Sequence, residues 1–249
     1  MSSYSPTLFI IEPKDIVLYL FFIYFIGDIV RKTYSIFLLI IFICTFSFVS
    51  ADIKKSNLEL LGKVIYIDPG HGGPDPGSIY KNIYEKDINL EICKKLEGVL
   101  EEEGAIVYLT RYGDYDLSKS YTGSRKKSDL NNRAKIINAS GADIYISIHL
   151  NSISSSTWSG AQVFYDDVNK NNYDLALLMQ EQLKNDLKTT RKVKEISTML
   201  MNRKITIPGI LVEVGFLSNP NDRYLLQKSD YQYKIVESIK KGIIKYFKV

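Results

Sequence analysis

The sequence predicts an α/β fold: a single three-layer domain in which a mixed, mostly parallel sheet of about six strands is flanked by helices. Short apolar runs alternate with segments whose apolar residues recur at helical spacing, which is typical of a layered α/β sheet. About 200 residues follow the hydrophobic N-terminus, enough for one buried core. The chain has two histidines, His71 and His149, and each lies at the end of a predicted strand or just after it. This placement predicts a site at the carboxyl edge of the sheet.

The first 51 residues contain two apolar stretches, at positions 16–26 and 36–49, with Arg31 and Lys32 between them. The second stretch has the form of a secretory signal, with a positive flank, a short apolar core and small residues up to Ala51. An uncleaved membrane anchor is the alternative. We expect residues 1–51 to be a signal or anchor, residues 52–61 a linker and residues 62–249 one folded domain outside the cytoplasm.

Residues 63–110 are expected to form a strand, a helix and a second strand. The apolar run at 63–67 is the first strand, and prolines and glycines then interrupt regular structure for about ten positions. Residues 86–103 have apolar side chains at helical spacing, and Gly104 ends that pattern. Residues 105–110 are the second strand, and a polar loop follows to position 124.

The alternation continues to position 165. Residues 128–140 indicate a helix that ends at Gly141, and residues 143–149 are the third strand. A serine-rich loop at 151–159 then leads to a fourth strand at 160–165.

The C-terminal part completes the predicted sheet and its helical cover. We expect a helix at 173–187, a weak edge strand within 192–200, a buried strand at 209–214, a short helix at 221–227 and an amphipathic helix at 231–247.

The net charge of +4, from 32 basic and 28 acidic residues, is mild. It suits an anionic polymer as substrate, but no basic helix or nucleic-acid-binding motif accompanies it, so we expect no nucleic-acid partner. The two cysteines have neither metal-type nor redox-type spacing. Disulfide and thiol chemistry are therefore not expected.

His71 and Glu85 are the first candidate site residues. His71 lies in a glycine-rich loop, where the backbone can approach a ligand closely. Glu85 lies at the start of the first predicted helix, where acidic residues are also favoured by the helix dipole alone. Each residue by itself therefore has a purely structural explanation.

His149 and Glu213 both lie in apolar strands. A buried polar side chain must find a partner, so His149 is either a satisfied core histidine or a site residue. The carboxylate of Glu213 is costly in a strand of isoleucine, leucine and valine unless it is paired or protonated. It is either a buried ion pair, for example with Arg133, or a general base with a raised pKa beside a metal.

Taken together, the four residues match the inventory of one hydrolytic site. Two histidines and one carboxylate suit a single catalytic zinc ion and leave one position open. A second carboxylate then remains to take a proton from water and deliver it to a leaving nitrogen.

The motifs around these residues resemble those of the zinc-dependent N-acetylmuramoyl-L-alanine amidases of the type 3 family. They occur in the same order as in that family, over residues 62–249, which implies that this segment is the catalytic domain. The matching segments are Asp68-Pro69-Gly70-His71-Gly72-Gly73, Glu85-Lys86-Asp87, Leu109-Thr110-Arg111, Asn132-Arg133-Ala134, Ser147-Ile148-His149-Leu150-Asn151 and Leu211-Val212-Glu213-Val214-Gly215-Phe216.

The resemblance implies a phosphorylase/hydrolase-like sheet flanked by helices, zinc ligands at His71, Glu85 and His149, and a catalytic glutamate at Glu213. The substrate that this resemblance implies is the amide between N-acetylmuramic acid and the L-alanine of peptidoglycan stem peptides. Asn151 and Gln162 are further candidates for contact with substrate. Gln162 stands where other members often have glutamate.

Within the family, the chain is most similar to the sporulation and germination amidases of endospore formers. That likeness implies spore cortex peptidoglycan as substrate, a product destined for muramic-δ-lactam, and a site of action in the cell wall or the forespore intermembrane space. The stretch from Asn151 to Gly160 is too short for the blocking helix that some relatives carry. An activating or tethering protein partner is therefore a hypothesis. The membrane is expected to be involved through the N-terminal segment alone.

Two other functions compete with this one. A zinc peptidase that cuts within stem peptides would use the same ligands, and the motif match speaks against it. A wall-binding protein without catalysis would have little reason to keep Glu213 in an apolar strand.

Overall fold

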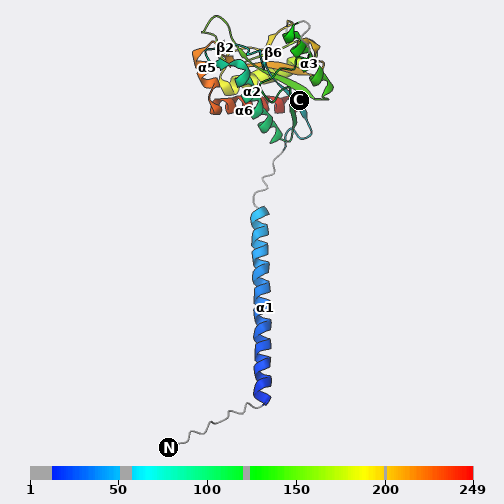
Figure 1. The fold of residues 1–249 in the computed structure, drawn as a ribbon, viewed down its shortest axis with the longest axis vertical. Coiled ribbons are helices and arrows are strands. Elements are labelled where there is room, and N and C mark those ends of the chain that lie inside the picture. Colours follow the sequence, from blue (N-terminus) through cyan, green and yellow to red (C-terminus); the bar gives the residue numbers. More distant parts are fainter. Residues whose placement is uncertain (1–12, 51–57, 120–123, 199–200, 249) are drawn as a thin grey trace, which may run out of the picture. The chain divides into compact units, whose positions relative to one another are not determined.

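The computed structural model describes residues 13–50, 58–119, 124–198 and 201–248. The chain divides into two compact units, Met1–Ser56 and Asn57–Val249, each with its own internal contacts. The first contains helix α1 (Pro13–Ser50) and the second contains every other element (Figure 1).

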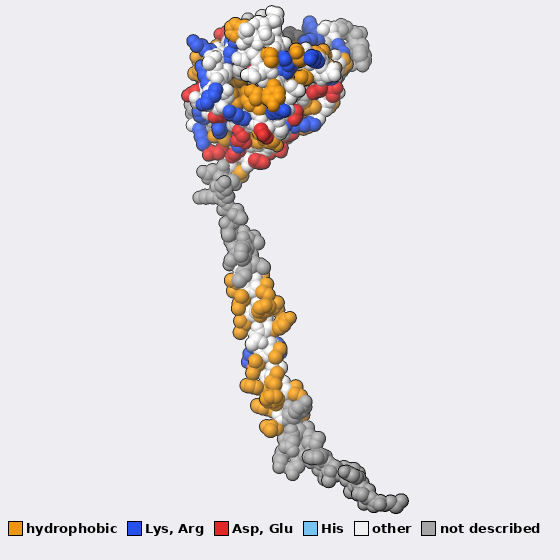
Figure 2. Space-filling model, turned by 90° about the vertical axis from the view of Figure 1, so that its left-hand side faces the viewer, with side chains coloured by type: hydrophobic (Ala, Val, Ile, Leu, Met, Phe, Trp, Pro, Cys, Tyr) orange, Lys and Arg blue, Asp and Glu red, His pale blue; other side chains and the backbone are white. Residues whose placement is uncertain are grey.

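Helix α1 joins the two predicted apolar stretches into one continuous helix that passes through Arg31 and Lys32. Lys32 pairs with Asp28 one turn earlier at 2.7 Å. In Figure 2 exposed apolar side chains cover two stretches of the helix, residues 20–26 and 36–43, and basic side chains lie between them. Among the described residues, no helix is both long enough and apolar enough to cross a membrane. The predicted cleavage site at Ala51 lies outside the described residues.

The second unit is built on a six-stranded sheet. In spatial order the strands are β4 (Ile106–Leu109), β1 (Val64–Pro69), β5 (Ile144–Asn151), β8 (Gly209–Phe216), β6 (Gln162–Tyr165) and β7 (Lys194–Glu195). Strands β4, β1, β5 and β8 run parallel, β6 is antiparallel to β8, and β7 is parallel to β6. The predicted mixed, mostly parallel sheet is thus confirmed, with the weak edge strand reduced to two residues.

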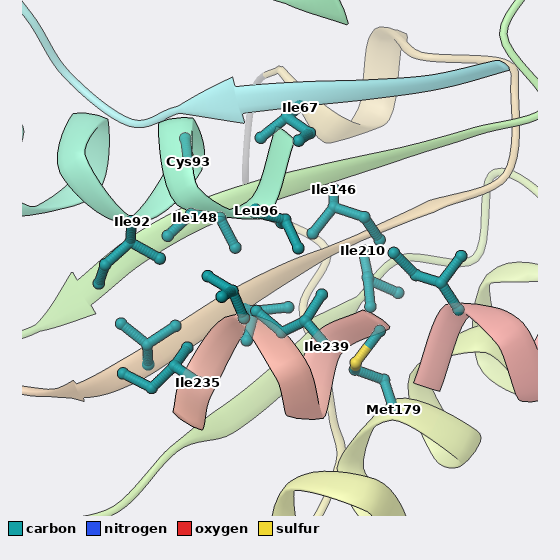
Figure 3. Close-up of a cluster of buried hydrophobic side chains, with 14 of the residues drawn as sticks. Ile67, Ile92, Cys93, Leu96, Ile146, Ile148, Met179, Ile210, Ile235 and Ile239 are labelled. Atoms are coloured by element: carbon teal, nitrogen blue, oxygen red, sulfur yellow. The ribbon is translucent and has the colours of Figure 1, made fainter. Parts of the chain in front are cut away.

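Strand β5 shows how the layers form. Its alternate residues point to opposite faces of the sheet. Ile146 and Ile148 join the main core, whereas Tyr145 belongs to a second, smaller cluster. In Figure 3 the main core is filled by isoleucines of the sheet and by side chains of three helices. These helices are α2 (Glu85–Glu101), α4 (Asn172–Leu187) and α6 (Ser229–Lys248).

The opposite face is covered by α3 (Arg125–Ala139) and a short 3-10 turn, η1 (Asn202–Lys204). Ala134 and Ile137 of α3 pack with Tyr145 in the smaller cluster, together with Met201 and Ile205 around η1. The three-layer prediction is therefore confirmed. The short helix α5 (Pro220–Leu226) follows β8 and adds Leu226 to the main core.

Several boundaries differ from the prediction. Helix α3 begins three residues early because the Ser124 side chain accepts a hydrogen bond from the Lys127 backbone N–H and so caps the helix. Strand β8 extends two residues further, to Phe216. Leu60, placed in the linker by its sequence position, is fully buried. A small antiparallel pair, β2 (Ile79–Tyr80) and β3 (Ile83–Tyr84), and the turn η1 were not predicted.

Candidate metal centre

The four candidate residues come together at the carboxyl edge of the sheet. His71 follows β1, His149 lies near the end of β5, Glu213 lies in β8, and Glu85 is the first residue of α2. His71, Glu85 and His149 each offer a ligand atom, and these atoms lie within 4.8 Å of one another. A metal ion could therefore contact all three.

Glu85 is at the centre of the cluster. Its Oε1 atom lies 3.2 Å from Nε2 of His71 and 3.1 Å from Nδ1 of His149. In a tetrahedral zinc site with bonds of about 2.0–2.1 Å, neighbouring ligand atoms lie about 3.3 Å apart. The spacing and the two-nitrogen, one-oxygen donor set both fit zinc.

Backbone groups hold the Glu85 carboxylate in place. The N–H of Ser78 donates to Oε2 at 2.8 Å, and the N–H of Leu150 donates to Oε1 at 3.0 Å. Burial alone would raise the pKa of Glu85, but hydrogen bonds with His149 and His71 outweigh it and hold the pKa well below its usual range. Glu85 is therefore an anion at neutral pH, as a metal ligand must be.

Asp75 orients the first histidine. Nδ1 of His71 lies 3.0 Å from Oδ2 of Asp75, so its N–H donates to that carboxylate and the other ring nitrogen faces the cluster. Burial lowers the pKa of His71, but Glu85 and Asp75 raise it by more. These two carboxylates thus favour positive charge at the His71 ring. This orienting role of Asp75 was not predicted from the sequence.

Two glycines make room for the cluster. A Cβ at Gly70 would lie 2.3 Å from Cε1 of His149, so the imidazole packs directly on this backbone. A Cβ at Gly77 would lie 2.7 Å from both Oε2 of Glu85 and Cδ2 of His71. Side chains at either position would displace the ligands.

A buried ion-pair network supports the loop that carries His71. Arg133 binds Asp68 at 2.7 Å and Asp129 at 3.0 Å, and its Nη2 atom donates to the backbone carbonyl of His71. Thr110 also donates to Asp68. Burial raises the pKa of Asp68, but the charge of Arg133 and these hydrogen bonds lower it to about 2. Arg133 is engaged here, so the alternative in which it neutralises Glu213 is wrong.

Glu213 lies beside the cluster. It pairs in register with His149 on the neighbouring parallel strand, so both side chains point to the same face of the sheet. Its Oε2 atom is buried and has no hydrogen-bond partner among the described residues. Burial, and then the charge of Glu85, raise the pKa of Glu213 to about 8. The raised pKa has the predicted direction.

The two candidate substrate residues have different surroundings. Asn151 lines a cavity of about 350 Å³ together with His71, His149 and Glu213. Gln162 lies opposite Glu213 on β6. Its side-chain oxygen accepts hydrogen bonds from Arg191 at 2.6 and 3.1 Å, so Gln162 is held by the protein itself.

Comparison with known proteins identifies the family. A family model for N-acetylmuramoyl-L-alanine amidase matches residues 65–245. The germination-specific N-acetylmuramoyl-L-alanine amidase of Bacillus subtilis (strain 168) is 45% identical over 216 residues, which cover 85% of this chain and 91% of the relative. The resemblance indicated by the motifs is confirmed.

Solved structures show the same fold. The CwlD amidase from Clostridioides difficile, in complex with the GerS lipoprotein, has a TM-score of 0.71 and 39% identity, covering 75% of this chain and 98% of that one. The catalytic domain of CwlV, an N-acetylmuramoyl-L-alanine amidase from Bacillus (Paenibacillus) polymyxa var. colistinus, has a TM-score of 0.66 and 30% identity, covering 75% of this chain and 99% of that one.

Proposed function

The chain belongs to the N-acetylmuramoyl-L-alanine amidase family, and from this premise we propose that it hydrolyses its amide substrate with one zinc ion held by His71, Glu85 and His149. The substrate is the bond between N-acetylmuramic acid and the L-alanine of a peptidoglycan stem peptide. The observation that carries the proposal is the juxtaposition of a three-ligand cluster with Glu213, whose buried Oε2 atom has no partner among the described residues.

The residues divide the chemical work. Zinc, when bound, supplies a Lewis acid that polarises the scissile carbonyl and lowers the pKa of water. Glu213 takes a proton from the attacking water on its carboxylate and delivers it to the departing nitrogen of L-alanine. Asp75 holds the ring of His71, and backbone N–H groups hold Glu85, so the ligands do not have to reorganise during the reaction.

We also propose a biological setting. The likeness to a germination-specific amidase and to CwlD favours a role in spore cortex maturation, where removal of stem peptides precedes muramic-δ-lactam formation. The apolar N-terminus suits a signal or an anchor that takes the domain out of the cytoplasm. Because the Clostridioides difficile amidase was solved with a lipoprotein, an extracytoplasmic protein partner is part of the proposal.

A digest of purified peptidoglycan, analysed by mass spectrometry, tests the proposed function. We expect stem peptides with free N-terminal L-alanine to be released, the release to stop with a chelator, and added Zn²⁺ to restore it. Cleavage inside the stem peptide would instead identify a peptidase.

The metal content of the same sample separates two explanations of an intact polymer. A zinc-loaded but inactive protein would indicate a missing partner. A protein that binds the polymer but takes up no zinc would contradict the proposal.

A further inference from the structure

Two cavities meet at the candidate metal centre. One, of about 310 Å³, lies toward α3 and η1, and we call it the α3 cavity. The other, of about 350 Å³, contains Glu213, and we call it the Glu213 cavity. Both are at the small end of the range for ligand sites, about 300–1,000 Å³. They share four lining residues: His71, Asp75, Lys126 and His149.

The two cavities differ in chemistry. The α3 cavity has an apolar part formed by Leu130, Met201 and Leu211. The Glu213 cavity is lined by polar groups that include Ser78, Asn151 and Ser152. An amide substrate that spans the metal cluster places a different half in each cavity.

We infer that the α3 cavity binds the peptide half of the substrate, with Lys126 contacting the carboxylate of an acidic second residue and Asn202 contacting a peptide carbonyl. This inference rests on the proposed function and gives the substrate a direction across the site. The sugar half, rich in hydroxyl groups, then faces the polar Glu213 cavity. The apolar part of the α3 cavity accommodates the methyl group of L-alanine.

Asn202 provides the first argument. The residue is 2% exposed and lines the α3 cavity, and its Nδ2 atom has no hydrogen-bond partner among the described residues. A buried donor without a partner is costly, so such groups are normally satisfied. A carbonyl oxygen of a bound peptide would satisfy this one.

Lys126 lines both cavities, so it does not itself select one of them, but it provides the cation that a carboxylate of a peptide in the α3 cavity would contact. Among the described residues, the basic side chains that line the α3 cavity are those of Lys126 and Arg133. Arg133 is fully engaged with Asp68, Asp129 and backbone carbonyls. Within the described part of the chain, the ammonium of Lys126 makes one long contact, 3.7 Å to Oδ2 of Asp75, and its side chain is 64% exposed. It therefore has donors left for a substrate carboxylate.

The carboxylates that line the α3 cavity are all paired with other groups. They therefore repel an anionic ligand less than unpaired carboxylates would. Asp75 is bound by His71, and Asp68 by Arg133, Thr110 and Ser147. Asp129 is bound by Arg133 and by the backbone N–H of Leu117.

The test compares two N-acetylmuramoyl-peptide substrates whose stem peptides differ in one group: a free carboxylate on the second residue, or its amide. With full-length protein we expect kcat/KM about two- to fivefold higher for the free acid, because an ion pair with an exposed lysine changes affinity by about that factor. Lys126→Gln should abolish this preference through KM and leave kcat unchanged. Lys127→Gln is the matched control, because Lys127 is exposed and lines neither cavity.

Asn202→Leu separates binding from folding. If Asn202 serves a ligand, replacing it by an apolar side chain of similar size should leave the melting temperature unchanged or higher and raise KM for both peptides. A lower melting temperature with unchanged KM would overturn the role of Asn202. An unchanged acid preference in Lys126→Gln would overturn the role of Lys126.

Binding of the two product stem peptides, one with a free carboxylate on the second residue and one with its amide, gives a readout that does not depend on turnover. Tighter binding of the acid, lost in Lys126→Gln, would support the inference even if the digest released no peptide. Equal binding of both peptides by the wild-type protein would overturn the inference while leaving the amidase activity intact.

Discussion

Oδ2 of Asp75 lies 3.0 Å from Nδ1 of His71, so a carboxylate outside the ligand cluster fixes one of its imidazoles. Partners of this kind typically contribute 10–100-fold to metal affinity. We expect Asp75→Ala to weaken zinc binding by about that factor, measured by competition with a chromophoric chelator. Asp167→Ala is the control, because Asp167 is exposed and pairs with Arg203 away from the cluster. Equal affinities in the two variants would contradict the orienting role.

Gly70 supports the other imidazole, since any Cβ there would lie 2.3 Å from the ring of His149. Gly70→Ala should therefore displace His149 and lower amidase activity at least tenfold, because changes that disturb the orientation of a metal ligand typically cost that much. Gly98→Ala is a matched control, because Gly98 lies inside α2 with nothing within 4 Å of the added Cβ. That control should be as active as the wild type and more stable by about 0.5–1 kcal/mol. A fully active Gly70→Ala protein would refute the close packing.

Asp68 links stability to acid pH. Its pKa in the folded protein, about 2, lies below the ordinary value of 3.8, so the interaction with Arg133 stabilises the fold above about pH 4 and is lost as the pH falls through about 2. The shift corresponds to about 2 kcal/mol. Urea unfolding between pH 7 and pH 2 should show Asp68→Asn to be less stable at pH 7, with the gap to wild type shrinking by about that amount in acid. A gap that stays constant with pH would contradict the assigned pairing.

Most of the fold could be predicted because its elements have strong local patterns. The strand that ends near His149 is an apolar run interrupted by Ser147, and the next parallel strand is interrupted by Glu213 itself. Such nearly continuous apolar runs are expected when helices cover both faces of a sheet. Gly104 and Gly141 adopt positive φ angles of 87° and 70° just after helices, which is why they marked the ends. The β2–β3 pair was missed because two-residue strands leave no periodicity to detect.

The site could be predicted in part. His71, Glu85, His149 and Glu213 stood out because each is a polar group at a strand end, a helix start or within an apolar strand. The role of Asp75 depends on the path of the loop after His71, which itself has a positive φ of 63°. Gly70 packs on His149, which lies 79 positions later, and Asp68 pairs with Arg133, which lies 65 positions later. No local pattern predicts such contacts.

The most direct test of the central claim is the Glu213→Gln variant, with zinc content and peptide release measured in the same sample and Glu195→Gln on the exposed strand β7 as control. Glutamine keeps the shape of the side chain but cannot accept the proton of the attacking water. We expect unchanged zinc content and thermal stability, and release of stem peptides slower by on the order of a hundredfold or more. Unchanged release in Glu213→Gln would contradict the assignment of Glu213 as the general base.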